Sequence, residues 1–276
     1  MNTRVLLACG LLAALSAPAS AAPPEVVAFA GGRRVSVGSV VGAGTPSGGR
    51  CAFASPAVVD VATLAAAVQI TISDTCEAVV TRLEGGLRRR GVPRGPFLPA
   101  AEEPASLTSR RGLDADVAQG LAAPAPRDPM SYRLGTVQQT VYDAAGVWQF
   151  EESFDVAFDR NLRTGYISGA HFFDGYCSAN PFTGIGVTNE VRSCYVSMPQ
   201  RGPSTVEMRG GGVYRQLLVG QELVRLRLAE RFVAVRDTNR DLADDHTFTC
   251  GIKEGTLPVG WGTYCFGDEV ETLEEA

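Results

Sequence analysis

The stretch that decides the fold is WQFEESFDVAF, residues 148–158. Large apolar side chains stand at 148, 150, 154, 156 and 158, and they alternate with Gln, Glu, Ser, Asp and Ala. Successive side chains of a strand point to opposite faces, so this period of two predicts a strand with one buried face. Glu152 falls on that apolar face, where a carboxylate is costly to bury without a partner.

Strand character continues on both sides of this stretch, and residues 221–232 are predicted as strand because of their neighbours, although their spacing also fits a helix. Turn residues at 143–146, 159–161, 210–212 and 237–239 separate many of the segments. Many short strands with Gly-rich turns predict an all-β fold of the sandwich or barrel type. The other predicted strands are 68–72, 136–142, 166–173, 194–198, 213–219, 223–228, 232–236, 247–252 and 261–266.

The segment 85–130 differs in composition from the rest of the chain. It holds seven of the 16 prolines, two arginine runs and few large apolar side chains. Such a composition buries too little surface to offset its ordering entropy, so we expect an extended or disordered Pro/Arg-rich linker. The linker would join two disulfide-stapled β-sandwich-like modules, a small one at 22–84 and a larger one at 131–272, followed by an acidic tail at 273–276.

The first 21 residues resemble a secretory signal, with Arg4, a short apolar run and small residues before a cut after Ala21. A lipoprotein signal ending at Cys9 is the alternative. Lys253 is the single lysine among 25 basic residues, a bias typical of high-GC bacterial genomes. We therefore expect a secreted bacterial protein, periplasmic if the source is Gram-negative, with no transmembrane segment in the mature chain.

Six cysteines follow the predicted signal. An even number in an exported chain indicates disulfides, and short spacing favours local pairs, two of which would each bracket a hairpin. No CxxC motif supports a zinc site in their place. The predicted bridges are Cys51–Cys76, Cys177–Cys194 and Cys250–Cys265.

Charge and motifs exclude several function classes. The net charge of −5 gives no basic excess for nucleic acid. No GxSxG, HExxH or phosphate-binding loop occurs in the sequence. His171 could act as a general base only with a partner that the sequence does not reveal. Glu152 could be an acid/base group with a raised pKa, or it could lie at a solvated strand end or pair with an arginine.

Two further groups are candidates for ligand binding. Trp261 and Tyr264 bring two aromatic rings into a Gly-rich segment, where they could stack on a sugar or a partner, or Trp261 could pack on the Cys250–Cys265 bridge. Oxygen ligands at alternate positions after 236 are typical of calcium loops, but a polar turn explains them equally well. The calcium candidates are Asp237, Asn239, Asp241 and Asp245. Apart from calcium, we expect no cofactor.

The sequence thus leaves two functions open. The first is a non-catalytic binding protein for an unknown extracellular protein or glycan, because loops on a rigid β scaffold are suited to recognition. The second is an extracellular hydrolase acting on carbohydrate, which would require two carboxylates facing one cleft. We favour the binding protein and expect no catalytic residues.

Overall fold

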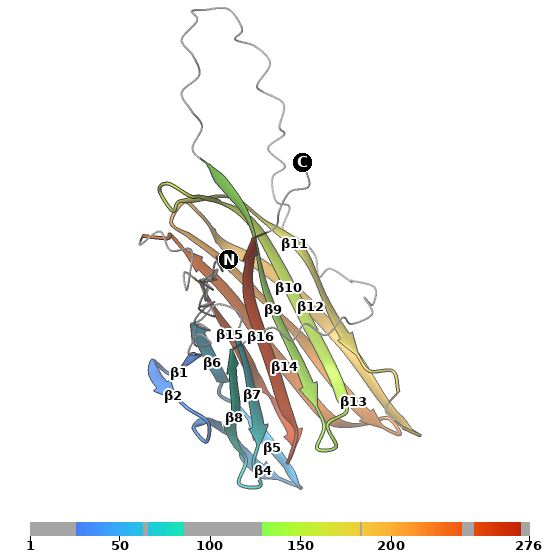
Figure 1. Cartoon of the computed structure of the whole chain (residues 1–276). Coiled ribbons are helices and arrows are strands. Elements are labelled where there is room, and N and C mark those ends of the chain that lie inside the picture. The colour runs from blue at the N-terminus through green and yellow to red at the C-terminus, as the bar shows by residue number, and fades with distance from the viewer. Residues whose placement is uncertain (1–25, 63–65, 86–128, 183, 239–245, 272–276) are drawn as a thin grey trace, which may run out of the picture.

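The computed structural model describes residues 26–62, 66–85, 129–182, 184–238 and 246–271. These residues form sixteen strands and no helix, arranged in two sheets that face each other (Figure 1). The all-β prediction is confirmed. The predicted signal, the acidic tail and most of the predicted linker lie outside the described residues.

The first sheet, sheet A, has nine strands. Seven of them follow the order β12 (Val187–Arg201), β13 (Thr205–Leu218), β14 (Gln221–Val235), β15 (His246–Pro258), β6 (Ala57–Ala62), β1 (Val27–Ala30) and β2 (Arg33–Val35). The other two are β5 (Arg50–Phe53), which pairs with the end of β15, and β4 (Thr45–Ser47), which pairs with β5.

The second sheet, sheet B, has seven strands and also combines distant parts of the chain. Its order is β11 (Ile167–Ala179), β10 (Trp148–Asn161), β9 (Met130–Tyr142), β16 (Gly262–Glu271), β7 (Ala66–Ile72), β8 (Glu77–Gly85) and β3 (Val40–Ala43).

The separation into two modules is not confirmed, because strands from before and after the predicted linker share each sheet. In sheet A, β15 pairs with both β5 and β6. In sheet B, β16 lies between β7 and β9. The segment 26–85 alone would leave these strands unpaired and one face of each sheet open, so hydrogen bonding and burial favour joint sheets.

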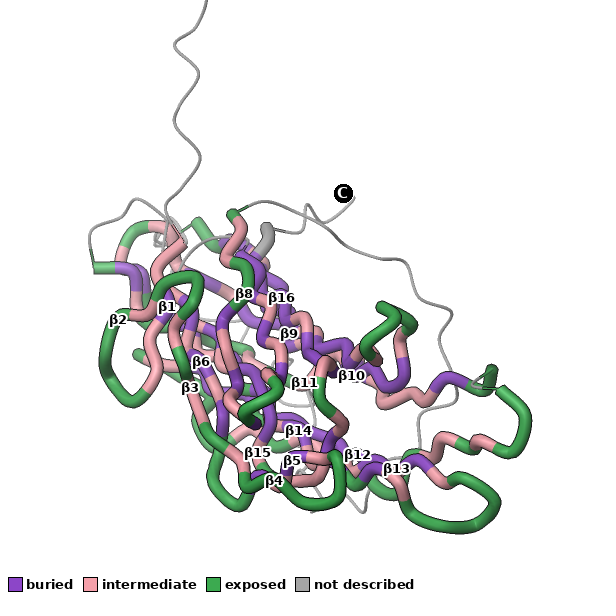
Figure 2. Tube along the Cα trace, turned by 90° about the horizontal axis from the view of Figure 1, so that it is seen from below, coloured by how far each residue is buried: buried purple, intermediate pink, exposed green. Residues whose placement is uncertain are grey.

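β10 confirms the strand at 148–158 and its buried apolar face, but the opposite face is not open, because Gln149, Glu151 and Ala157 are buried as well. Phe150, Phe154, Val156 and Phe158 are all fully buried between the sheets. Figure 2 shows that buried residues follow the strands, whereas exposed residues gather in the turns and at the strand ends. The ambiguous segment is also a strand, since β14 runs without a break from Gln221 to Val235.

The predicted turn at 210–212 is wrong, because these three glycines lie inside β13. A Cβ at Gly210 would overlap the Phe154 ring of the facing sheet. Glycine therefore serves here to make room for a ring from the opposite layer. The same arrangement recurs at two further places, with Phe232 on Gly135 and Phe248 on Gly267.

All three predicted disulfide pairs are present. The predicted hairpins within them are not, because each bridge joins sheet A to sheet B. Cys177 of β11 binds Cys194 of β12, and Cys250 of β15 binds Cys265 of β16. Two residues that are close in sequence lie in different layers, so each bridge fixes a crossover of the chain.

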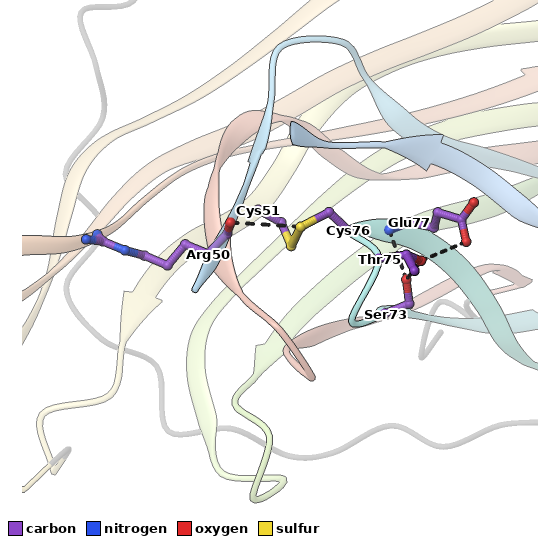
Figure 3. Close-up of a disulfide and its surroundings, with 6 residues drawn as sticks. All are labelled: Arg50, Cys51, Ser73, Thr75, Cys76 and Glu77. Atoms are coloured by element: carbon purple, nitrogen blue, oxygen red, sulfur yellow. Dashed lines mark hydrogen bonds between the residues drawn. A yellow bond between two sulfur atoms is a disulfide. The ribbon is translucent and has the colours of Figure 1, made fainter. Parts of the chain in front are cut away.

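The third bridge joins Cys51 of β5 to Cys76 in the turn between β7 and β8 (Figure 3). The turn is closed by two hydrogen bonds, in which the Ser73 N–H donates to the Glu77 carbonyl at 2.9 Å and the Glu77 N–H donates to Ser73 Oγ at 3.0 Å. Thr75 Oγ1 also donates to the Glu77 carboxylate at 3.0 Å. These hydrogen bonds fix the shape of the turn, and the Cys51–Cys76 bridge attaches the turn to β5 of sheet A.

Candidate functional site

A groove of about 450 Å³ lies on the outer face of sheet B. Its floor follows from the strand register, in which Gly262 of β16 lies between Thr71 of β7 and Tyr142 of β9. Gly262 has no side chain, so a depression remains between the two flanking side chains. Because a Cβ at Gly262 would lie 2.6 Å from the Ile70 carbonyl oxygen, glycine is also required by the close approach of the backbones.

The next row of paired residues along the strands adds polar groups and a second tyrosine to this groove, which we call the tyrosine groove after Tyr142 and Tyr264. Tyr264 pairs with Thr140 of β9 on one side and with Gln69 of β7 on the other, and Gln69 pairs with Arg82 of β8. All four residues line the groove. A ring, an amide, a hydroxyl and a guanidinium thus surround the depression on strands whose positions the sheet fixes.

The rim of the tyrosine groove is the turn between β9 and β10. Asp143 Oδ1 accepts hydrogen bonds from the backbone N–H groups of Ala145 and Val147, both at 2.9 Å. Its Oδ2 accepts a third from Gln149 Nε2 at 2.8 Å. The predicted turn at 143–146 is therefore confirmed, and the Asp143 carboxylate is used to hold it.

The other carboxylate that lines the groove is Glu84, which forms an ion pair with Arg82. A pair of carboxylates for glycoside hydrolysis needs one group free to donate a proton and one free to attack or to activate water. In the tyrosine groove, one carboxylate is bound to the turn and the other to an arginine. The geometry therefore suits holding a ligand better than cleaving it.

The sequence candidates for ligand and calcium binding have different positions. Tyr264 lines the tyrosine groove, whereas Trp261 is 6% exposed and belongs to the core between the sheets. Of the calcium candidates, Asp237 is buried, and Asn239, Asp241 and Asp245 lie outside the described residues. Among the residues that are described, no group of three or more His, Cys, Asp or Glu is placed to hold a metal ion.

Glu152 is fully buried between the sheets, so it lies neither at a solvated strand end nor against an arginine. Its Oε2 accepts a hydrogen bond from the Tyr214 hydroxyl at 2.9 Å. Burial raises the pKa of Glu152 from its ordinary value of 4.5 to about 8, and the hydrogen bond from Tyr214 offsets only part of that rise. The carboxyl is therefore protonated at neutral pH.

Glu230 of β14 reaches the same interior from sheet A and is 2% exposed. Desolvation, together with the charge of Glu152, raises the pKa of Glu230 well above its ordinary value. Neither of its carboxyl oxygens has a hydrogen-bond partner among the described residues. The sequence contains the same signal that singled out Glu152, because Glu230 stands among the inward apolar residues of β14, but the sequence analysis did not use it.

The two glutamates lie between two of the bridges that join the sheets. In sheet B, one register row reads Cys265, Gln139, Glu152 and Cys177. In sheet A, Glu230 pairs with Cys250. Gln139 connects the layers by accepting a hydrogen bond from the backbone N–H of Gly251 at 3.1 Å. None of these row residues lines the tyrosine groove.

The two histidines differ in environment. His171 is exposed on β11, and its Nδ1 lies 2.8 Å from the Gly169 carbonyl oxygen. His246 is 2% exposed and lies 3.7 Å from the Glu269 carboxylate, which binds Arg160 at 2.9 and 3.1 Å. Burial and, to a smaller extent, the charge of Arg160 lower the pKa of His246 to about 4. His246 is thus a neutral core residue at physiological pH.

Comparisons of the chain with protein-family models, with curated proteins and with solved structures found no match. In the described part of the chain, no helix has the length and apolar character needed to span a membrane.

Proposed function

We propose that the protein is a secreted bacterial, non-catalytic binding protein and that the tyrosine groove receives a glycan. The observation that carries this proposal is the groove itself, a depression over Gly262 flanked by Tyr142 and Tyr264. Its volume of about 450 Å³ falls within the usual range for small-ligand sites.

The lining has the chemistry that a sugar needs. The rings of Tyr142 and Tyr264 offer apolar surface to the C–H face of a sugar ring. Gln69, Gln138 and Thr140 offer donors and acceptors for sugar hydroxyls. These side chains project from strands and not from long loops, so little conformational entropy is lost when a ligand binds.

A carbohydrate hydrolase is the alternative. The observation in its favour is Glu152, a carboxyl group that stays protonated at neutral pH, as a general acid must. Against it, Glu152 and Glu230 are buried between the sheets and do not line the tyrosine groove. We therefore favour binding over catalysis.

The three disulfides are consistent with an extracellular location, or a periplasmic one in a Gram-negative source. A target outside the cytoplasm, either a glycan or a glycosylated protein, fits that location.

Titration calorimetry with neutral oligosaccharides (cello-, malto-, chito- and galacto-oligomers) tests the proposal. We expect at least one series to bind, and Tyr264→Ala to weaken that binding at least tenfold, which is about 1.4 kcal/mol. Phe173→Ala is the matched control, because Phe173 is an exposed aromatic residue of the same sheet outside the groove. Thermal melting verifies that both variants fold.

Two results would count against the proposal. One is an equal loss of binding in the Tyr264 and Phe173 variants. The other is cleavage of any of these oligosaccharides that Glu152→Gln abolishes while the melting temperature is kept, since this would establish the hydrolase.

A further inference from the structure

The outer face of sheet A carries arginines in an unfavourable arrangement. On β14 the inward positions are apolar apart from Glu230, so Arg225, Arg227 and Arg231 point outward. The register places Arg231 directly opposite Arg209 of β13, and Arg225 directly opposite Arg215. Like charges directly opposite each other on neighbouring strands destabilise a sheet. Two such pairs on one face therefore suggest a role in recognition.

Glutamates neutralise this face only in part. Glu207 accepts hydrogen bonds from both arginines of the first pair, Arg209 at 2.6 Å and Arg231 at 2.7 Å. In the second pair, Arg215 binds Glu190 at 2.7 Å. Arg225 forms no hydrogen bond or ion pair with any of the described residues. An uncompensated guanidinium thus remains at the second pair.

A groove of about 510 Å³ lies beside Arg225. It forms where β15 changes its partner, because Ile252 pairs with Ala57 of β6 whereas Gly255 pairs with Phe53 of β5. Gly255 keeps the floor low, and a Cβ there would overlap the backbone of Arg225. This arginine groove is lined by Arg225, Arg227, Glu254, Thr256, Val213 and Phe53.

We propose that the arginine groove binds an acidic polysaccharide, with a carboxylate or sulfate group held between Arg225 and Arg227. Guanidinium groups match such planar or trigonal anions with paired hydrogen bonds. Glu254 forms an ion pair with Arg227 at 3.4 Å and lines the same groove, where its carboxylate can also accept hydrogen bonds from sugar hydroxyls. The two opposed arginine pairs lie six residues apart on β13, or ~20 Å along the strand, so the face can follow several sugar units.

The interspersed glutamates distinguish this ligand from a nucleic acid. Duplex DNA carries about one charge per 1.7 Å and has no hydroxyl donors along its backbone, so it would place phosphates against Glu207, Glu190 and Glu254. A sparsely charged, hydroxyl-rich chain can satisfy both the arginines and the glutamates. The net charge of −5 also disfavours a dense polyanion.

The test is titration of the full mature protein with oligogalacturonate, alginate oligomers and chondroitin sulfate oligosaccharides. We expect at least one to bind, with an affinity that falls as sodium chloride is raised. The same oligomer with its acid groups esterified or removed should not bind. Arg225→Ala should weaken binding about tenfold, and its fold should survive because this exposed side chain has no partner among the described residues.

Arg33→Ala is the matched control, since it removes the same charge from an exposed position on β2, away from the arginine groove. The proposal is overturned if none of the three oligomers binds, if Arg33→Ala and Arg225→Ala weaken binding equally, or if single-stranded DNA or inorganic sulfate binds as tightly. Tyr264→Ala should leave this binding unchanged, so failure of the tyrosine groove and failure of the arginine groove are separate outcomes.

Discussion

The buried glutamates predict a stability that falls as pH rises from about 4.5 towards 8. Glu152 has a pKa of about 8 in the folded protein and 4.5 when unfolded, because burial disfavours its charged form. Below pH 4.5 the group is protonated in both states, and the stability has its full value. As pH rises towards 8, only the unfolded chain loses the proton, so the free energy of unfolding falls by about 1.4 kcal/mol per pH unit for this group.

Glu230 acts in the same direction, since its pKa is also raised. His246 acts oppositely, but only between its folded pKa of about 4 and its ordinary 6.5. Between pH 6.5 and 8, His246 is neutral in both states, so this is the range in which the effect of the glutamates can be measured without it. There we expect the free energy of unfolding to fall as pH rises, by about 1.4 kcal/mol per pH unit from Glu152 until the pH approaches its pKa, and Glu230 should add to this fall.

Glu152→Gln should at least halve this slope, because glutamine mimics the protonated carboxyl and can still accept the hydrogen bond from Tyr214. At pH 7 the variant should be more stable than the wild type by about 3 kcal/mol, the linkage energy for about 2.5 pH units. At pH 4 the two proteins should be equally stable, within about 0.5 kcal/mol.

The assay is urea unfolding with the disulfides intact, followed by tryptophan fluorescence at half-unit pH steps. The control is Glu222→Gln, which changes an exposed glutamate at the start of β14 and should leave the curve unchanged at every pH. Parallel pH curves for wild type and Glu152→Gln would refute the reasoning, because they would mean that Glu152 is ionised or solvated in the folded protein.

Three further predictions follow from the packing. Gly210→Ala should destabilise the protein by about 1–3 kcal/mol through its clash with Phe154, and the loss should be smaller in a Phe154→Leu background; additive losses in thermal melting would contradict the contact. Replacing Cys250 and Cys265 together by serine should cost about 3 kcal/mol for a loop of this length, and urea unfolding of the variant measures it. Trypsin should cut first within 85–130. No disulfide bridge spans that segment, so the two pieces should separate in a denaturing non-reducing gel. In native gel filtration they should remain together, because strands from both pieces share each sheet.

The strands and the disulfide bridges could be predicted from the sequence because both depend on residues that are close to each other in the chain. The alternation in 148–158 predicted the buried face of β10, and short cysteine spacing predicted all three pairs. The layer to which each strand belongs was not predictable in this way. Cys177 and Cys194 look like the two arms of a hairpin in sequence, although their strands lie in different sheets.

The role of Gly210 also could not be predicted, because it depends on a residue that is distant in the sequence. Gly210 looks like part of a turn because nothing near it in sequence explains a missing side chain. The explanation is the Phe154 ring, which comes from the facing sheet. The tyrosine groove was foreseen only through Tyr264, since its floor depends on a register that brings Thr71, Gly262 and Tyr142 into one row.

The position of β16 determines when the fold can be completed. This strand contains the last described residues of the chain, yet it pairs on one side with β7 and on the other with β9. During synthesis sheet B therefore remains in two unjoined parts until residues near 271 have emerged, and its central gap is filled last. The export proposed above would gain from this order, because a polypeptide that cannot close its sheet early stays extended enough to pass a translocation channel. Loss of the segment after Pro258 would remove a central strand and the partner of Cys250, so such a truncated chain should fail to close sheet B and should not fold.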